Sequence, residues 1–408
     1  MAQTPRRSSP VSRRHLLMGG AATLGAMTVA RPTPIGADES AVVSDTPPTE
    51  HVGTAIESCW GPHQAGVTTP LQSFASFVGF TLRTGVTRAD LARLMKVWTD
   101  DIERLTQGLP ALADVAPELA AVPARLTITV GVGPGLFTAA GMQDVPRPRW
   151  LRPLPRFNVD DLQRRWSGGD LVVQIGADDP ITVSHARQVL TGDAKATANV
   201  DWVQPGFHRA VGTTPAGSTG RNLMGFIDGT VNPTPGTSDF DSVVWVDEGP
   251  DWIRGGSGMV LRRIRMNLDT WSGLDRTSRE QMMGRRLSDG APLTGGSEKD
   301  PPDLAATTNG LLTIPEFAHI RLAAPQNPEE RIYRRPYNYD DGETNGIPDA
   351  GLLFVAFAGD VDRQFVPIQE RLQDEDLLNV WTTPIGSSVA AVLPGFESGG
   401  WLGHALFG

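Results

Sequence analysis

Along the first part of the chain, mostly apolar runs alternate with segments in which apolar residues recur every three or four positions. The apolar run 73–83 predicts a β-strand. Segment 87–107 predicts a helix, because its apolar residues share one helical face: Leu91, Leu94, Met95, Trp98 and Ile102. Thr87 and Asp90 at its start match a capping box, in which each side chain bonds the main chain of the other residue.

Similar elements follow along the rest of the chain. Apolar runs predict strands at 124–133, 170–179 and 258–268, and helical patterns lie near 183–190 and through 275–286. Two long stretches, 201–257 and 286–350, are rich in Gly and Pro and have no regular period. Loops of that length in a compact protein usually carry function, so we expect functional residues in them.

The second half of the chain repeats the plan of the first. Segment 351–373 matches segment 170–190 in order, since each has an apolar strand, an acidic turn and an amphipathic helix. Two copies of a strand–helix–strand unit predict an α+β fold with two ferredoxin-like domains of the dimeric α+β barrel type. We expect antiparallel sheets with peripheral helices, and domains at 59–220 and 221–408.

The N-terminus has the pattern of a twin-arginine export signal. Residues 12–17 read SRRHLL, and an uncharged, moderately apolar run follows at 16–30. This run is shorter and less apolar than a spanning helix of about 20 residues. We expect a signal over residues 1–37, a flexible leader over 38–58, and a mature protein on the periplasmic or extracellular side.

Composition narrows the function further. The 408 residues carry a net charge of −10, which argues against a nucleic-acid partner and a polybasic membrane anchor. Cys59 is the only cysteine, so an internal disulfide and a Cys-clustered zinc or iron–sulfur site are excluded. The chain has no C-x-x-C-H motif, so any haem would be held without thioether links.

One carboxylate lies in an apolar setting within the first long loop. Asp228 stands in RNLMGFIDGTVNP (221–233), between Gly225 and Gly229 and after several apolar residues. An ionised carboxylate in such surroundings costs several kcal/mol unless something compensates its charge. Asp-Gly is also a common turn dipeptide, so a capping role is the simpler interpretation of this motif alone.

The second long loop brings together a histidine and two arginines. His319 lies in TIPEFAHIRLAAP (313–325), whose alternating pattern predicts a half-buried strand with an ordinary core histidine. Arg334 and Arg335 follow in ERIYRRPYNYDDG (330–342), which holds all three tyrosines of the chain. A solvated surface is the usual interpretation of paired arginines, although the aromatic crowding weakens it.

These motifs together resemble a known family. RNLMGFIDGTVNP, AHIRLAAP, RIYRRPYNYDDG and GLLFVAFAGDVDRQFVPIQERL occur in the order found in dye-decolourising peroxidases, and the resemblance runs from about Gly53 to the C-terminus. It implies a haem-dependent enzyme that reduces hydrogen peroxide and oxidises organic electron donors such as dyes and phenolics through a ferryl intermediate. It also implies one non-covalent haem b per chain, and a fold unrelated to the helical plant and fungal peroxidases.

The resemblance implies a role for each matching residue at the haem. Asp228 is similar to the distal acid–base residue, and His319 looks like the proximal iron ligand. Arg334 looks like the distal arginine, with Arg335 as the alternative because the spacing from the histidine varies among relatives.

Further positions follow from the same resemblance. Leu352 and Phe354 resemble residues that roof the distal pocket, and Asp360 is similar to a carboxylate that accepts from the second nitrogen of His319. Large dyes would be oxidised at the surface through aromatic side chains, for which the candidates are Trp381, Trp401, Tyr333 and Tyr337.

Three other classes of protein remain open. An exported haem carrier or iron-acquisition protein would keep His319 but would not need Asp228. A chlorite-dismutase-like haem enzyme would share the lineage but lack the Asp228 motif. A purely structural domain requires the four-motif match to be accidental. The presence of both Asp228 and Arg334 favours the peroxidase.

Overall fold

The computed structural model describes residues 52–215, 217–344 and 346–408. The predicted export signal and most of the predicted leader lie outside these residues. The last residues of that leader form main-chain hydrogen bonds, from Ala124 N–H to Gly53 O and from Arg125 N–H to Ala55 O. This end of the leader is therefore packed rather than flexible.

The first half of the chain forms a four-stranded antiparallel sheet covered by two long helices. Its elements are β1 (Phe74–Leu82), α1 (Arg88–Thr106), β2 (Thr127–Val132), β3 (Leu171–Ala177), α3 (Pro180–Asp193) and β4 (Ala198–Phe207). The strand order β4-β1-β3-β2 is that of a ferredoxin-like unit. The predicted capping box of Thr87 and Asp90 at the start of α1 is confirmed.

The second half builds the same unit. Its elements are β5 (Ser257–Met266), α5 (Leu268–Ser272), α6 (Arg276–Met283), β9 (Tyr337–Thr344), β10 (Ile347–Ala358), α8 (Val361–Gln364), α9 (Val366–Glu375) and β11 (Thr382–Val392). The order β11-β5-β10-β9 matches that of the first half, strand for strand. The expected α+β class, with antiparallel strands and peripheral helices, is confirmed.

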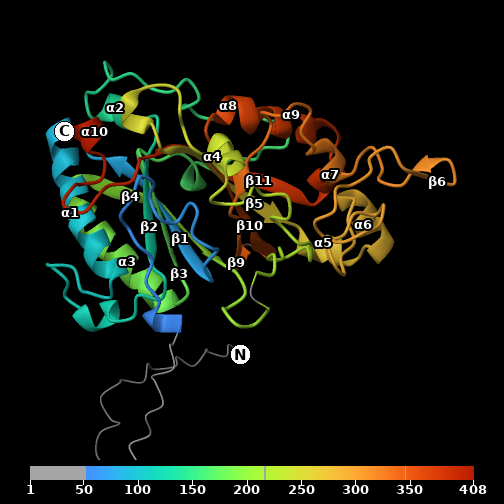
Figure 1. Ribbon diagram of the computed structural model, residues 1–408, viewed down its shortest axis with the longest axis horizontal. Helices are drawn as coiled ribbons and strands as arrows, with labels where there is room; N and C mark the ends of the chain where they lie inside the picture. Colours follow the sequence, from blue (N-terminus) through green and yellow to red (C-terminus); the bar gives the residue numbers. More distant parts are fainter. Residues whose placement is uncertain (1–51, 216, 345) are drawn as a thin grey trace, which may run out of the picture. The chain divides into compact units, whose positions relative to one another are not determined.

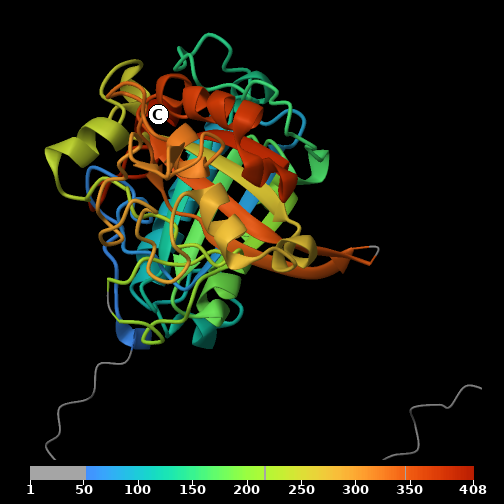
Figure 2. The ribbon, with the colours of Figure 1, turned by 90° about the vertical axis from the view of Figure 1, so that its right-hand side faces the viewer.

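The two sheets join into a closed ring. β2 pairs with β11 and β4 pairs with β9, so neither unit leaves an open edge at these strands. Figures 1 and 2 show the ring between α1 and α3 on one side and α5, α6 and α7 on the other. The β9–β10 hairpin projects beyond the ring (Figure 2). β8 (Tyr333–Arg334) pairs with Ala356 and Phe357 of β10, just beyond Leu353, which pairs with the first residue of β9.

Short elements fill the connections. They are η1 (Val52–Thr54), η2 (Pro117–Ala120), α2 (Leu136–Ala139), η3 (Arg164–Trp166), η4 (Ala194–Ala196), α4 (Ser238–Val244), η5 (Asp251–Ile253), β6 (Thr307–Thr308), β7 (Leu311–Leu312), α7 (His319–Leu322), η6 (Leu377–Val380) and α10 (His404–Phe407). Within the described ranges, no helix has the length and apolar character needed to cross a bilayer.

Alternation along β10 separates two parts of the core. Leu353, Val355 and Phe357 are buried inside the ring, in one cluster with residues of β1, β4, β5 and β9. Leu352 and Phe354 point to the opposite face, because successive side chains on a strand alternate. On that outer face they join an apolar cluster that includes residues of α5, α6 and the 221–233 loop.

The strand predicted across 313–325 is wrong. The chain there turns at Pro315, whose carbonyl accepts from Ala318 N–H, and then forms the single-turn helix α7. The Arg321 guanidinium donates to the carbonyls of Ile314 and Pro315 and so holds the turn together. These local bonds replace a strand ladder, and an alternating pattern alone cannot reveal them.

Candidate active site

The loop that carries Asp228 is a tight, glycine-dependent hairpin. Arg221 and Ile227 form an isolated antiparallel bridge, and Gly225 turns the chain with a φ of 94°. Gly229 has a φ of 111°, a region that residues with a Cβ rarely adopt. Both glycines around Asp228 are therefore required by the backbone.

The hairpin brings Asp228 to Arg334, 106 residues later in the chain. Arg334 Nη1 donates to Asp228 Oδ1 at 2.8 Å, and the two side chains are 22% and 15% exposed. The second carboxylate oxygen, Oδ2, has no hydrogen-bond partner among the described residues. The pair thus leaves one carboxylate oxygen and the remaining guanidinium N–H groups available to a ligand.

The neighbouring arginine points the other way. Arg335 is buried inside the ring, where it donates to the main-chain oxygen of Thr69 and to Gln72 Oε1. Because adjacent residues on a strand face opposite sides, only one of the two arginines can reach Asp228. The structure places Arg334 there, which removes the alternative that the sequence left open.

His319 opens α7 and is paired with a buried carboxylate. Its Nδ1 lies 2.6 Å from Asp376 Oδ2, and the Asp376 side chain is 4% exposed. The expected partner Asp360 is wrong: it caps α8 by accepting from Arg363 N–H, and it also pairs with the Arg363 side chain. Asp360 precedes α8 and α9, whereas Asp376 directly follows α9 and bonds His319 at the start of α7.

The charges around His319 show that these groups share one region. Burial lowers the pKa of His319, but the charge and hydrogen bond of Asp376 outweigh it, so the pKa is raised overall. Arg334 lowers the pKa of His319 and Asp228 raises it, by smaller amounts. The structure therefore brings His319, Asp228 and Arg334 within electrostatic reach of one another.

The residues present fit a haem. His319 donates through Nδ1, and its Nε2 has no hydrogen bond among the described residues, which is the state of a histidine ready to ligate iron. Leu352 and Phe354 offer an apolar wall beside Arg334, whose strand partner is Ala356 on the same face of β10. Cys59 is buried and unpaired, and no thioether motif is present.

Three further residues shape the site, and the motifs did not single them out. Asn232 bonds the main chain of Arg334 through both ends of its amide. Glu298 Oε1 accepts from the hydroxyls of Thr219 and Thr230, which lie on either side of Asp228. Asp376 holds His319. Only Asn232 carried a sequence signal, because it lies in the same motif as Asp228.

The aromatic candidates for surface oxidation separate by burial. Tyr333 and Tyr337 are 7% and 1% exposed, so neither offers a surface to a bulky dye. Trp381 is partly exposed and packs edge-on against Trp271, with 5.5 Å between ring centroids. Trp271 in turn contacts Phe226 of the Asp228 hairpin at 6.0 Å, so Trp381 is linked by ring contacts to the site.

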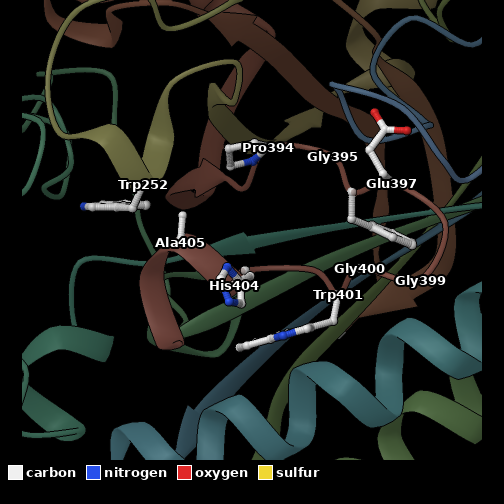
Figure 3. A pocket seen from close by; sticks show the side chains of 11 residues that line it. Trp252, Pro394, Gly395, Glu397, Gly399, Gly400, Trp401, His404 and Ala405 are labelled. Carbon is white, nitrogen blue, oxygen red and sulfur yellow. The ribbon is translucent and has the colours of Figure 1, made fainter.

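Trp401 lies at the C-terminal end of the chain, beside a separate hollow of about 510 Å³. Figure 3 shows Trp401 and His404 facing each other, with Trp252 on the opposite side of the hollow. None of the residues lining it belongs to the Asp228–Arg334–His319 group. The residues that line this hollow include His404 and Glu397 but no arginine or lysine, so it has no counterpart of the Asp228–Arg334 pair.

Two family models match the chain. The model described as Dyp-type peroxidase, N-terminal, matches residues 64–208, and the model described as Dyp-type peroxidase, C-terminal, matches residues 219–397. The second match contains Asp228, His319, Arg334 and Asp376.

Relatives agree with these matches. The dye-decolorizing peroxidase of Thermobifida fusca is 39% identical, over 84% of this chain and 83% of its own. A deferrochelatase of Yersinia pestis is 34% identical, over 94% of this chain and 92% of its own. The crystal structure of a DyP-type peroxidase from Cellulomonas bogoriensis superposes with a TM-score of 0.85 at 49% identity, covering 88% of this chain and 99% of that one.

Proposed function

Because this chain belongs to the Dyp-type peroxidase family, we propose that it uses haem to reduce hydrogen peroxide and to oxidise organic electron donors. In this proposal His319 would hold one non-covalent haem b, and Asp228 and Arg334 would act on the peroxide. We also propose that the protein acts after export by the twin-arginine route, on the basis of the SRRHLL motif.

The Asp228–Arg334 pair is the observation that carries the proposal. A protein that only transports haem needs a ligand and an apolar pocket, but it has no use for a carboxylate with a free oxygen beside a cation. The loop of Asp228 contributes Met224 and Phe226 to an apolar cluster, and the Arg334 guanidinium at 2.8 Å compensates the charge of the Asp228 carboxylate beside it. The pair is therefore suited to proton transfer.

A bound haem would supply the redox-active iron and porphyrin for the two-electron reduction of peroxide. Asp228 Oδ2, which Arg334 does not occupy, accepts the proton from one peroxide oxygen and returns it to the other. The remaining N–H groups of Arg334 stabilise negative charge on the departing oxygen, and one such donor is commonly worth about 2.7–4 kcal/mol. The apolar wall of Leu352 and Phe354 limits competition from water.

Asp376 sets the state of His319, the residue that would hold the haem iron. By accepting from Nδ1 it fixes the tautomer in which Nε2 is free, and it makes the imidazole a stronger electron donor. A stronger proximal donor favours cleavage of the O–O bond.

Rapid mixing of the haem-loaded protein with peroxide tests this assignment. We expect Asp228→Ala and Arg334→Leu each to slow the spectral change of the haem by roughly a hundredfold, since about 3 kcal/mol is lost. The double variant should lose less than the sum, because both residues act on one step. Single variants that react at the wild-type rate would exclude peroxide activation by this pair.

The deferrochelatase relatives motivate a parallel measurement. The same haem-loaded protein, incubated without peroxide under reducing conditions, would yield iron-free porphyrin if iron removal were its reaction. We expect intact haem on extraction, together with peroxide-dependent oxidation of a dye. Stoichiometric release of porphyrin without peroxide consumption would replace the peroxidase proposal.

Electron donors too large for the haem pocket need a surface contact, and we propose Trp381 for this role because its ring contacts lead through Trp271 to Phe226. Trp381→Phe should lower turnover of a bulky anthraquinone dye while the reaction with peroxide keeps its rate. Trp401→Phe serves as the matched control. A loss of dye turnover in Trp401→Phe alone would assign the oxidation of bulky donors to Trp401 beside the C-terminal hollow.

A further inference from the structure

Arg334 is held at two points by one short turn. Asp228 binds its guanidinium, and four residues later Asn232 binds its main chain: Arg334 N–H donates to Asn232 Oδ1 at 3.0 Å, and Asn232 Nδ2 donates to Arg334 O at 2.7 Å. The turn itself is closed by a hydrogen bond from Asn232 N–H to Gly229 O.

The main-chain groups of Arg334 need such a partner. β8 is only two residues long and pairs with β10 on one side, where Arg335 N–H donates to Val355 O. Along an antiparallel strand the main-chain groups of alternate residues point to opposite edges, so those of Arg334 point away from β10. Asn232 supplies one acceptor and one donor there, as the peptide group of another strand would.

The amide of Asn232 is suited to bonding both main-chain groups of Arg334. Among side chains of this length only asparagine offers both an acceptor and a donor, since aspartate has no donor and leucine has neither. The hydrogen bond from Arg334 Nη1 to Asp228 Oδ1 fixes only the tip of a long side chain with many rotamers, so the position of Arg334 also depends on how its main chain is held.

We propose that Asn232 is a positioning residue for peroxide activation, which sets the place of Arg334 relative to Asp228 without touching the substrate. This inference rests on the proposed peroxidase function. Displacement of a catalytic group by about 1 Å can cost roughly a hundredfold in rate, so the loss of two anchoring bonds should be visible in the kinetics.

The test compares Asn232→Ala and Asn232→Asp with Asn327→Ala in the haem-loaded protein. Asn327 is the matched control, because its amide also uses both ends, yet it is exposed and its hydrogen bonds go to Glu329 and Glu330 rather than to Arg334. We expect both Asn232 variants to slow the reaction with peroxide by roughly tenfold to a hundredfold. Asn327→Ala should react as wild type.

Fluoride binding, followed by the haem spectrum, is the readout that does not depend on turnover. A displaced Arg334 stabilises a bound anion less well, so the fluoride dissociation constant should rise in the Asn232 variants. In an Arg334→Leu background, Asn232→Ala should have no further effect on fluoride binding or on the peroxide rate.

Any of the following results would contradict a positioning role for Asn232. An equal effect of Asn232→Ala with and without Arg334 would assign Asn232 a general structural role. Loss of haem or of cooperative unfolding in both Asn232 variants would assign it to folding. Wild-type fluoride affinity and rate in both variants would exclude any role, while a wild-type protein inert to peroxide would instead refute the peroxidase proposal itself.

Discussion

Replacement of Asp376 by asparagine probes how the protein holds its histidine. Asp376 accepts two hydrogen bonds with separate oxygens: Oδ2 from His319 Nδ1 at 2.6 Å, and Oδ1 from Leu378 N–H at 3.0 Å. Asparagine has the same shape but only one acceptor atom. The variant must therefore leave either the histidine or the Leu378 amide without its acceptor.

The size of the effect follows from this geometry. A buried donor without a partner costs about 1–3 kcal/mol, and an amide that still faces His319 is a weaker acceptor than a carboxylate. Loss of such a partner behind a metal ligand commonly lowers metal affinity by roughly ten- to a hundredfold. We expect a fall of that size in haem affinity and a higher midpoint potential, because a less basic imidazole stabilises ferric iron less.

Haem titration of the apoprotein and spectroelectrochemistry of the loaded protein measure the two quantities. Asp360→Asn is the matched control, since Asp360 is a nearby carboxylate that caps α8 and has no contact with His319. It should change neither quantity. If Asp376→Asn bound haem with wild-type affinity and potential while Asp360→Asn did not, the pairing argued from the structure would be refuted.

Three further predictions concern the rest of the chain. Burial, followed by hydrogen bonding and charge repulsion from Asp193, raises the pKa of Asp101 to about 8, so the folded protein keeps a proton that the unfolded chain releases above its ordinary pKa near 3.8. The stability from this proton is complete below pH 4 and is lost as the pH rises to about 8, so the melting temperature should fall over this range and Asp101→Asn should flatten the dependence. Gly229→Ala should lower the melting temperature and the peroxide rate together, because a Cβ at a φ of 111° costs about 1–2 kcal/mol, and an unchanged melting curve would contradict the assigned strain. Arg13→Lys with Arg14→Lys should leave folded, haem-loaded protein in the cytoplasm, as fractionation would show, whereas normal export would indicate another route.

The local pattern of apolar and polar residues predicts most of the strands and helices. The strand 73–83, the helix 87–107 and its capping box lie within a residue or two of the observed β1 and α1. Strands and helices of this length depend on periodicity and on bonds between residues three or four apart, both of which are visible in the sequence. The repeated strand–helix order likewise predicts two ferredoxin-like units.

Contacts between distant residues were harder to predict. The alternating pattern of segment 313–325 predicts a strand, but the Arg321 guanidinium and Pro315 close it into a turn and a short helix. Asp360 and Asp376 are both acidic residues beside the same helix, and which of them faces His319 depends on how α7 and α9 pack together. No local pattern contains that information.

The class of fold, the family and the residue types of the site are predictable from the sequence, because these depend on composition, periodicity and short motifs. The tertiary structure alone decided which arginine faces Asp228 and which carboxylate holds His319. It also decided that Asn232 closes the free edge of β8. The physical reason is that these pairings depend on strand alternation and helix packing across 57 to 106 residues of chain, where a shift of one position turns a side chain to the opposite face.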